Sequence, residues 1–315
     1  MSRSYKATGI NLKAIPMGET DRLLTILTVE QGIIRAIAPG ARKHKSRLGG
    51  RSGQFVINEL LVIQGRQLDK VVQAETVRSF PGLATHLAKL TASQYLAELV
   101  LCQALGGQPQ EALFALFVEH LERLDQAAMG GVMASLCQGI FHLLALAGVA
   151  PEVQRCCVSQ TPIVPDLMAT DWHVGFSAIA GGIIQGQHLP NTVAESHSPR
   201  HRLRTAQGRY SFNSSDNGLN TSHRPQRRGG IPQTVPGPTP ITAAELALLQ
   251  RLGQPELLMV QETPGVGDFP GSLLSQPLWS RIEHLLRQYA QYHFDRPIRS
   301  AALLEACFPV TVAPE

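Results

Sequence analysis

Two runs of β-branched residues flank a turn in the segment Thr25-Ile-Leu-Thr-Val-Glu-Gln-Gly-Ile-Ile-Arg-Ala-Ile37. β-Branched side chains favour strands, and the Gln31-Gly32 pair between the runs is typical of a short hairpin turn. The segment therefore predicts two antiparallel strands, Thr25–Val29 and Ile33–Ile37.

Three further strands are predicted around this hairpin, and no convincing helix lies between them. They are Tyr5–Ile15, Phe55–Ile63 and Val71–Val77. Such a unit is too small for a two-sheet sandwich but suits a closed barrel, which leaves no exposed sheet edge. We therefore expect a five-stranded OB-fold barrel within residues 1–80.

The hydrophobic period becomes helical after Gly82, where apolar residues recur every three or four positions. The sequence predicts five helices, whose approximate ranges are 83–101, 113–124, 132–146, 243–252 and 278–289. The third is almost wholly apolar and is expected at the centre of a helical domain. Residues 126–151 carry no formal charge and are long enough to cross a bilayer, but polar residues interrupt them. We therefore expect a buried helix and no membrane contact.

The remaining segments lack a regular apolar pattern. We expect irregular structure over residues 151–190, whereas residues 190–240 are rich in Ser, Asn, Pro, Gly and Arg. The expected fold class is α+β. It comprises an N-terminal five-stranded OB-fold barrel (1–80), an α-helical domain (81–189 and 241–315) and a disordered basic insert (190–240).

The net charge of +4 conceals an uneven distribution of charge along the chain. Residues 1–80 contain 13 basic and 6 acidic side chains, whereas residues 81–150 contain 2 and 5. Residues 151–240 contain 8 and 5, and residues 241–315 contain 5 and 8. A basic unit joined to acidic helical segments favours a polyanion-binding face, although a solvated surface of uneven charge is the alternative.

The strongest local signal lies between Glu30 and Glu59, where no acidic residue occurs. The stretch Pro39-Gly-Ala-Arg-Lys-His-Lys-Ser-Arg-Leu-Gly-Gly50 falls there between two predicted strands. Cations without local counter-ions suit a polyphosphate, because each neutralised phosphate releases condensed counterions. A solvated loop that keeps the protein soluble is the alternative. We expect DNA phosphate contacts first from Arg42, Lys43, Lys45, Arg47 and Arg51, and next from Arg22, Arg35 and Arg66.

Aromatic residues are scarce in the predicted barrel, which offers only Tyr5, Phe55 and Phe80. Bases that stack on aromatic side chains gain about 1–3 kcal/mol each, so few such platforms are available. Binding is therefore expected to be mostly electrostatic, tolerant of sequence and steeply dependent on salt.

Catalytic and cofactor patterns are missing from the sequence. It contains no Walker loop, no GxSxG elbow and no HExxH, and its 11 histidines are scattered. Five cysteines exclude a disulfide scaffold, and the adjacent Cys156 and Cys157 have no second pair with which to complete a zinc site. We expect a cytoplasmic protein that is not an enzyme and has neither cofactor nor metal, although residual metal binding at Cys156/Cys157 stays open.

Four stretches resemble the bacterial recombination mediator family RecO, a family of DNA repair proteins. The resemblance covers roughly residues 5–185 and 272–305. The stretches are Gly18-Glu-Thr-Asp-Arg-Leu-Leu24, Gly40-Ala-Arg-Lys-His-Lys-Ser-Arg-Leu-Gly-Gly50, Arg155-Cys-Cys-Val with Phe176-Ser and Gly181-Gly182, and Arg296-Pro-Ile-Arg-Ser300.

This resemblance implies an OB fold followed by a helical domain that binds single- and double-stranded DNA and anneals complementary strands. It also implies contact with the single-strand-binding protein and, together with RecR, help in loading RecA onto coated single strands. Many relatives have a CxxC at the position of Cys156 and a second Cys pair after Gly181-Gly182. Here Ser159 stands at the end of the first motif, and no Cys occurs in the stretch up to Gln185, so the zinc site is expected to be lost.

Two other functions stay open from the residues alone. The chain could be a protein-interaction adaptor, in which Arg281, Arg287, Arg296 and Arg299 are the candidates to receive an acidic tail. It could also be an OB protein that binds RNA, because barrels of this kind bind either nucleic acid.

Overall fold

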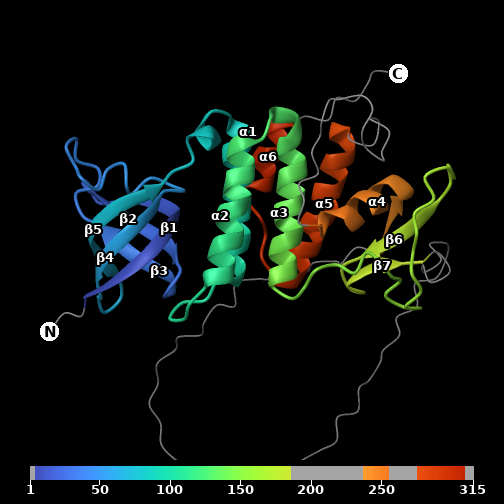
Figure 1. Ribbon diagram of the computed structural model, residues 1–315, viewed down its shortest axis with the longest axis horizontal. Helices are drawn as coiled ribbons and strands as arrows, with labels where there is room; N and C mark the ends of the chain where they lie inside the picture. Colours follow the sequence, from blue (N-terminus) through green and yellow to red (C-terminus); the bar gives the residue numbers. More distant parts are fainter. Residues whose placement is uncertain (1–3, 186–236, 255–274, 309–315) are drawn as a thin grey trace, which may run out of the picture.

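The structure, a computed structural model, describes residues 4–185, 237–254 and 275–308. The barrel lies at one end of the molecule, a layer of upright helices fills the middle, and a small sheet with a short helix lies at the other end (Figure 1). The α+β architecture expected from the sequence is confirmed.

Five strands close into the barrel in the order β1-β2-β3-β5-β4. They are β1 (Ser4–Met17), β2 (Asp21–Thr28), β3 (Gly32–Ala38), β4 (Ile57–Ile63) and β5 (Asp69–Arg78). The long strand β1 pairs with β2 through its second half and with β4 through its first half, which closes the barrel. The β3–β5 pair is parallel, and the other pairs are antiparallel. The predicted OB-type barrel is confirmed.

The turn between β2 and β3 joins the barrel to the helical part. The N–H of Ile33 donates to the carbonyl of Leu105 at 3.0 Å, and the N–H of Gly107 donates to the carbonyl of Gln31 at 2.9 Å. Gly32 has a φ of +63°, and a Cβ there would lie 2.0 Å from the carbonyl oxygen of Leu105. Only glycine fits so close an approach in this backbone conformation.

Two hydrophobic cores hold the described structure together. The smaller core fills the barrel and includes Leu24, Ile26 and Val62. The larger core lies among the helices but also includes six residues of the N-terminal unit 1–80: Ile10, Leu12, Leu27, Phe55, Ile57 and Phe80. The barrel and the helical part therefore share buried surface, and removal of either would expose apolar side chains of the other.

The helical layer is built around α3 (Val132–Leu146), which packs against α1 (Leu87–Gln103), α2 (Glu111–Gln126) and α5 (Gln276–Phe294). The stretch Met129–Leu146 is apolar and long enough to cross a membrane, but 67% of it is buried inside the molecule. Its apolar sequence reflects this central position, as predicted. The remaining helices are α4 (Ala243–Leu252), α6 (Ala301–Cys307) and the short turns η1 (Pro81–Ala84) and η2 (Met129–Gly131).

A three-stranded antiparallel sheet lies next to α4. Its central strand β6 (His173–Ser177) pairs with β7 (Gly182–Ile184) and β8 (Thr239–Thr242). The prediction of irregular structure over 151–190 is therefore wrong for β6 and β7. The predicted insert, 190–240, lies outside the described residues except for its last four, of which Thr239 and Pro240 begin β8.

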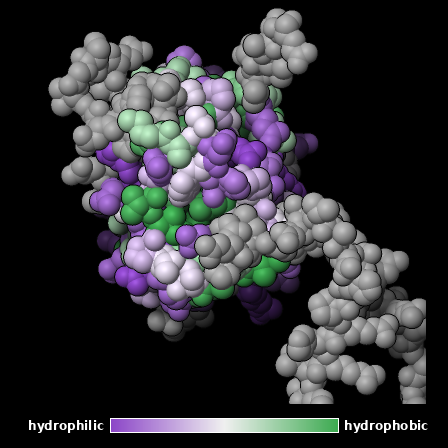
Figure 2. All heavy atoms as spheres, turned by 90° about the vertical axis from the view of Figure 1, so that its right-hand side faces the viewer, coloured by the Kyte–Doolittle hydropathy of each residue, from purple (hydrophilic) through white to green (hydrophobic). Residues whose placement is uncertain are grey.

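The end of the molecule opposite the barrel has an apolar surface. Figure 2 shows this face, with hydrophobic residues gathered between polar ones. Large exposed apolar side chains occur in the segments around β6 and β7: Val158, Val164, Leu167, Met168 and Ile179. This surface differs in character from the cationic barrel end described below.

Candidate nucleic-acid interface

The predicted cationic segment forms the loop between β3 and β4, residues 39–56, which we call the basic loop. Arg42, Lys43, Lys45 and Arg47 are exposed, and Arg51 is half-buried. None of these five side chains forms an ion pair with a carboxylate of the described residues. The loop therefore presents positive charge that the described part of the fold leaves without paired counter-ions.

The first part of the basic loop is fixed to the turn between β1 and β2. The Asp21 carboxylate accepts a hydrogen bond from the N–H of Gly40 at 2.7 Å. The N–H of Arg42 donates to the carbonyl of Thr20 at 2.8 Å, and its guanidinium donates to the carbonyl of Gly18 at 2.8 Å. The hydrogen bond from Gly40, together with that from the Thr20 hydroxyl, lowers the pKa of Asp21. Asp21 thus holds the loop as a carboxylate.

The second part of the loop is fixed by three side chains from the barrel strands. The Arg22 guanidinium donates to the carbonyl of Gly49 at 3.1 Å and to Oγ of Ser52 at 2.9 Å. The buried amides of Asn11 and Asn58 donate to the carbonyl of Arg51, at 2.8 Å and 2.9 Å. Sequence reasoning missed both asparagines. Their signal was a polar residue at a buried position among apolar strand residues, which needs a hydrogen-bond partner.

Phe55, the next-to-last residue of the basic loop, has a left-handed backbone conformation. Its φ is +60°, its side chain is buried, and its ring lies 6.2 Å from the ring of Phe117 on α2. The N–H of Phe55 donates to the carbonyl of Asn11 at 2.8 Å. Strand β4 therefore begins at Ile57, two residues later than predicted, because a left-handed residue cannot continue a strand.

Two depressions adjoin the second part of the loop. One is a hollow of about 530 Å³ lined by Arg47, Gly50, Arg51 and Thr76. The other is a groove of about 590 Å³ on the outer face of β1, β4 and β5, which Arg47 and Arg51 also line. Three carboxylates, those of Glu30, Glu59 and Glu75, line the groove but not the hollow.

The other three predicted DNA contacts, Arg22, Arg35 and Arg66, lie outside the basic loop. Arg22 is half-buried and holds the loop, so the described contacts give it a positioning role. Arg35 is exposed on β3, and Arg66 is exposed in the turn between β4 and β5. The β3–β5 pairing places Asp69 beside Ala36, which brings the chain near Arg66 toward Arg35. Phosphate contact by these residues stays a prediction.

The four arginines expected to receive an acidic tail divide into two pairs. Arg281 contacts Glu245 at 3.1 Å and also donates to the carbonyl of Pro240. Arg287 lies between Glu283 at 3.5 Å and Glu305 at 2.7 Å. Both guanidiniums are thus neutralised by neighbouring carboxylates, which leaves them poorly suited to a further acidic group.

Arg296 and Arg299, by contrast, are exposed in the connection between α5 and α6. Neither forms an ion pair with a carboxylate in the described ranges. The backbone N–H of Arg299 donates to the Glu98 carboxylate of α1 at 2.7 Å, which fixes the segment against that helix. This pair is the better candidate for an acidic partner.

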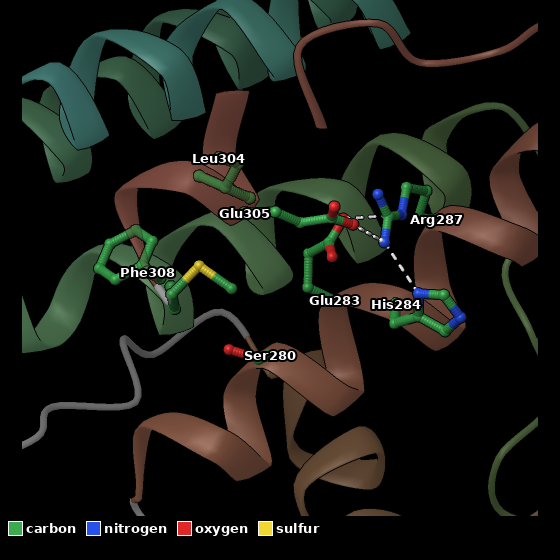
Figure 3. Close-up of a pocket in the computed structure, with 8 residues that line it drawn as sticks. Ser280, Glu283, His284, Arg287, Leu304, Glu305 and Phe308 are labelled. Carbon is green, nitrogen blue, oxygen red and sulfur yellow. Dashed lines mark hydrogen bonds and ion pairs between the residues drawn. The ribbon is translucent and has the colours of Figure 1, made fainter. Parts of the chain in front are cut away.

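A cavity of about 310 Å³ lies beside Arg287 (Figure 3). Figure 3 shows Glu283 and Arg287 of α5 facing Glu305 of α6, while His284 contacts Arg287 from the other side. Burial raises the pKa of Glu283, against the opposing effect of Arg287, and burial lowers the pKa of His284. The apolar side chains of Met133, Leu304 and Phe308 complete the lining. The Arg287 guanidinium is paired with Glu283 and Glu305, so the described lining of the cavity offers no unpaired cation to a ligand.

The position of the relatives' zinc site holds no suitable donor set here. The Sγ of Cys156 accepts a hydrogen bond from the N–H of Gln185 at 3.3 Å, and Ser159 bonds to Thr161. In the described part of the chain, no three His, Cys, Asp or Glu side chains are grouped to hold a metal ion. These residues do not fit a tetrahedral zinc site, which needs four ligands.

A closed five-stranded barrel with a cationic loop that forms no ion pair with a described carboxylate is typical of OB-fold proteins that bind polyanions. Comparison with known proteins narrows this class. Residues 1–80 match the family model for Recombination protein O N terminal, and residues 84–200 match Recombination protein O C terminal. The chain belongs to the RecO family of DNA repair proteins.

The similarity to individual RecO proteins extends over nearly the whole chain. The DNA repair protein RecO of Nostoc punctiforme is 48% identical, over 98% of this chain and 97% of the relative. The RecO of Acaryochloris marina is 48% identical over 98% and 96%, and that of Gloeobacter violaceus is 39% identical over 99% and 97%. The resemblance found in the sequence is confirmed.

Proposed function

We propose that this protein binds single- and double-stranded DNA through the phosphate backbone, anneals complementary strands and helps to load RecA onto coated single strands. The observation that carries the proposal is the basic loop, whose five cations form no ion pair with a described carboxylate. Binding of phosphates to such cations releases condensed counterions, which supplies most of the binding free energy independently of sequence.

The aromatic residues of the barrel support binding without base recognition. Phe55 and Phe80 are buried, and the half-buried Tyr5 donates its hydroxyl to Asp69. Among the described barrel residues, none presents an exposed aromatic ring on which a base could stack. Phosphate contacts without base contacts fix a strand in place and read no sequence, which suits a factor that must anneal any pair of strands.

Contact with the single-strand-binding protein is the second part of the proposal. Arg296 and Arg299 support it, because two exposed and unpaired guanidiniums on a fixed segment suit an acidic peptide. The roles of RecR and RecA rest on the family resemblance. The action proposed is non-covalent, so we propose a mediator without enzymatic activity.

The experiment that tests this function is annealing of complementary oligonucleotides, naked and coated with single-strand-binding protein, at increasing salt. We expect the protein to accelerate both reactions and the acceleration to fall steeply with salt. If the protein does not accelerate annealing of naked strands at low salt, the proposal is wrong. Competition between single-stranded DNA and RNA for the protein tests the RNA-binding alternative.

An adaptor that works only through proteins is the other candidate, and Arg296 and Arg299 are the observation in its favour. Because six residues of the N-terminal unit 1–80 belong to the helical core, residues 81–315 alone would expose apolar surface and are unsuitable for the test. Full-length protein with the basic loop neutralised should be used instead. An adaptor would keep its mediator activity in this variant, whereas a DNA-binding mediator would lose it.

A further inference from the structure

The hollow lined by Arg47, Gly50, Arg51 and Thr76 has a lining well suited to an anion. Its lining includes two arginines and no acidic residue. Guanidinium groups offer paired N–H donors whose geometry matches phosphate oxygens. We propose that this hollow binds one phosphate group of the nucleic-acid backbone, and that Asn58 is the positioning residue that assembles it. The inference rests on the DNA-binding function proposed above.

Asn58 joins the two walls of the hollow through one buried side chain. Its Nδ2 donates to the carbonyl of Arg51 at 2.9 Å, and its Oδ1 accepts the hydroxyl hydrogen of Thr76 at 3.2 Å. The residue itself is 0% exposed. The side-chain amide supplies both the donor and the acceptor that these two hydrogen bonds need. Asn58 therefore fixes the basic loop, at Arg51, to strand β5, at Thr76.

The same attachment extends to the second guanidinium. Nη1 of Arg51 donates to the carbonyl of Arg47 at 3.3 Å, four residues earlier in the loop. The amide of Asn11 also donates to the Arg51 carbonyl, at 2.8 Å, so that this carbonyl is held from two strands. Arg47 and Arg51 thus start from defined backbone positions. A preorganised site binds more tightly, because less conformational freedom is lost when the ligand arrives.

The groove beside the hollow differs from it in carrying carboxylates. Glu59 follows Asn58 on β4 and lies directly opposite Glu75 on β5. Both carboxylates line the groove beside the hollow, as does Glu30. The groove also contains Lys6, so its three carboxylates are balanced by three cations, whereas the hollow is lined by cations without carboxylates. A phosphate is therefore expected to prefer the hollow to the groove. Arg42 lines neither depression, and its guanidinium is fixed at Gly18 in the turn between β1 and β2.

A double-mutant cycle in the full-length protein tests the role of Asn58. The substitutions are Asn58→Leu, which is uncharged and similar in size, Arg51→Gln in the hollow, and Arg42→Gln as the matched control outside it. The measurement is the affinity for an oligothymidylate of about 16 nucleotides, the upper range of one OB-fold site. Loss of one phosphate contact is expected to weaken binding about fivefold at 0.1 M salt.

If Asn58 acts through Arg51, Asn58→Leu weakens binding in the wild-type protein and adds little once Arg51 is Gln. With Arg42→Gln the two effects multiply, because that residue lies outside the hollow. An equal effect of Asn58→Leu in all three backgrounds would overturn the proposal. Unchanged binding in both arginine variants would overturn the DNA-binding function of the loop itself, which is a distinguishable failure.

Thr76 provides a second test that does not disturb a buried position. Thr76 is exposed, so Thr76→Val and Thr76→Ser should both fold. Valine removes the hydroxyl that donates to Asn58, whereas serine keeps it. We expect weaker oligothymidylate binding for valine and near wild-type binding for serine. Equal affinities of the two variants would contradict the assembly of the hollow by Asn58.

Discussion

The carboxylate of Asp21 accepts a hydrogen bond from the backbone N–H of Gly40, with 2.7 Å between Oδ1 and N. Asp21 begins β2, and Gly40 lies at the start of the basic loop. Two of the four stretches that resemble RecO proteins, Gly18–Leu24 and Gly40–Gly50, are therefore joined by a hydrogen bond. An acidic residue next to a cationic loop here holds the loop in place and does not neutralise it through an ion pair.

Substitution of Asp21 separates these two roles. Asp21→Asn removes the negative charge and keeps an oxygen that can accept from Gly40, so we expect single-stranded DNA binding at least as tight as in the wild type. Asp21→Ala also removes the charge but frees the loop, so we expect weaker binding. Affinity at fixed salt is the measurement. Equal binding by the alanine and asparagine variants would show that the hydrogen bond does not matter.

At Phe55, substitution by glycine should destabilise the protein no more than substitution by alanine, the reverse of the usual order. Truncation of this buried ring is expected to lower the free energy of unfolding by about 3–5 kcal/mol. Because φ is +60°, Phe55→Gly avoids a left-handed backbone penalty of about 1–2 kcal/mol that Phe55→Ala keeps. Urea unfolding should find the glycine variant at least as stable as the alanine variant. A clearly more stable alanine variant would contradict the backbone geometry.

The buried histidine pair between α2 and α3 should make stability dependent on pH. Burial, followed by the neighbouring His142 and Arg123, lowers the pKa of His120 from 6.5 to about 3. Nε2 of His120 lies 3.1 Å from Nδ1 of His142. The folded protein keeps His120 neutral, whereas the unfolded chain binds a proton below pH 6.5. Stability is therefore highest above pH 6.5 and falls as the pH decreases toward 3.

From pH 7 to pH 5 the contribution of His120 to this loss is about 2 kcal/mol. Urea unfolding at a series of pH values measures it. His120→Gln should flatten the dependence, whereas His44→Gln in the exposed basic loop should leave it unchanged. A dependence that is equally steep in the wild type and in the His120 variant would show that another group is responsible. His142, whose pKa is also lowered by burial, is the first alternative.

The exposed arginine pair should govern binding of an acidic peptide. Arg296→Ala combined with Arg299→Ala is expected to weaken binding of a peptide from the acidic tail of single-strand-binding protein. Arg281→Ala serves as the control, because its guanidinium already contacts Glu245. Fluorescence anisotropy of the labelled peptide measures both. If the control variant loses binding and the Arg296/Arg299 variant keeps it, the assignment is wrong.

The barrel strands and most helices could be predicted because each has a hydrophobic pattern that is complete within its own segment of sequence. The Thr25–Ile37 hairpin and the apolar α3 each contain a complete pattern within one segment. Strands β6 and β7 were missed because they have five and three residues, too few to show alternation. Strand β8 pairs with β6 from more than 60 residues further along the chain, and no local pattern reports such a pairing.

The sequence predicted the cationic residues of the candidate site but not the side chains that hold the basic loop in place. Clusters of Lys and Arg are visible in the sequence, so the basic loop was found. Asn11 and Asn58 were missed because their role depends on the fold, which brings β1 and β4 to the carbonyl of Arg51. For the same reason the sequence did not distinguish Arg287, which is paired inside the fold, from the exposed Arg299.

The central claim is that the basic loop binds phosphates, and the salt dependence of single-stranded DNA binding tests it most directly. Arg42, Lys43, Lys45 and Arg47 are replaced together by Gln, and the logarithm of the binding constant is plotted against the logarithm of salt concentration. We predict weaker binding and a slope shallower by about 3, since each phosphate contact contributes about 0.7 on single strands. An unchanged affinity and an unchanged slope would contradict the assignment of the loop.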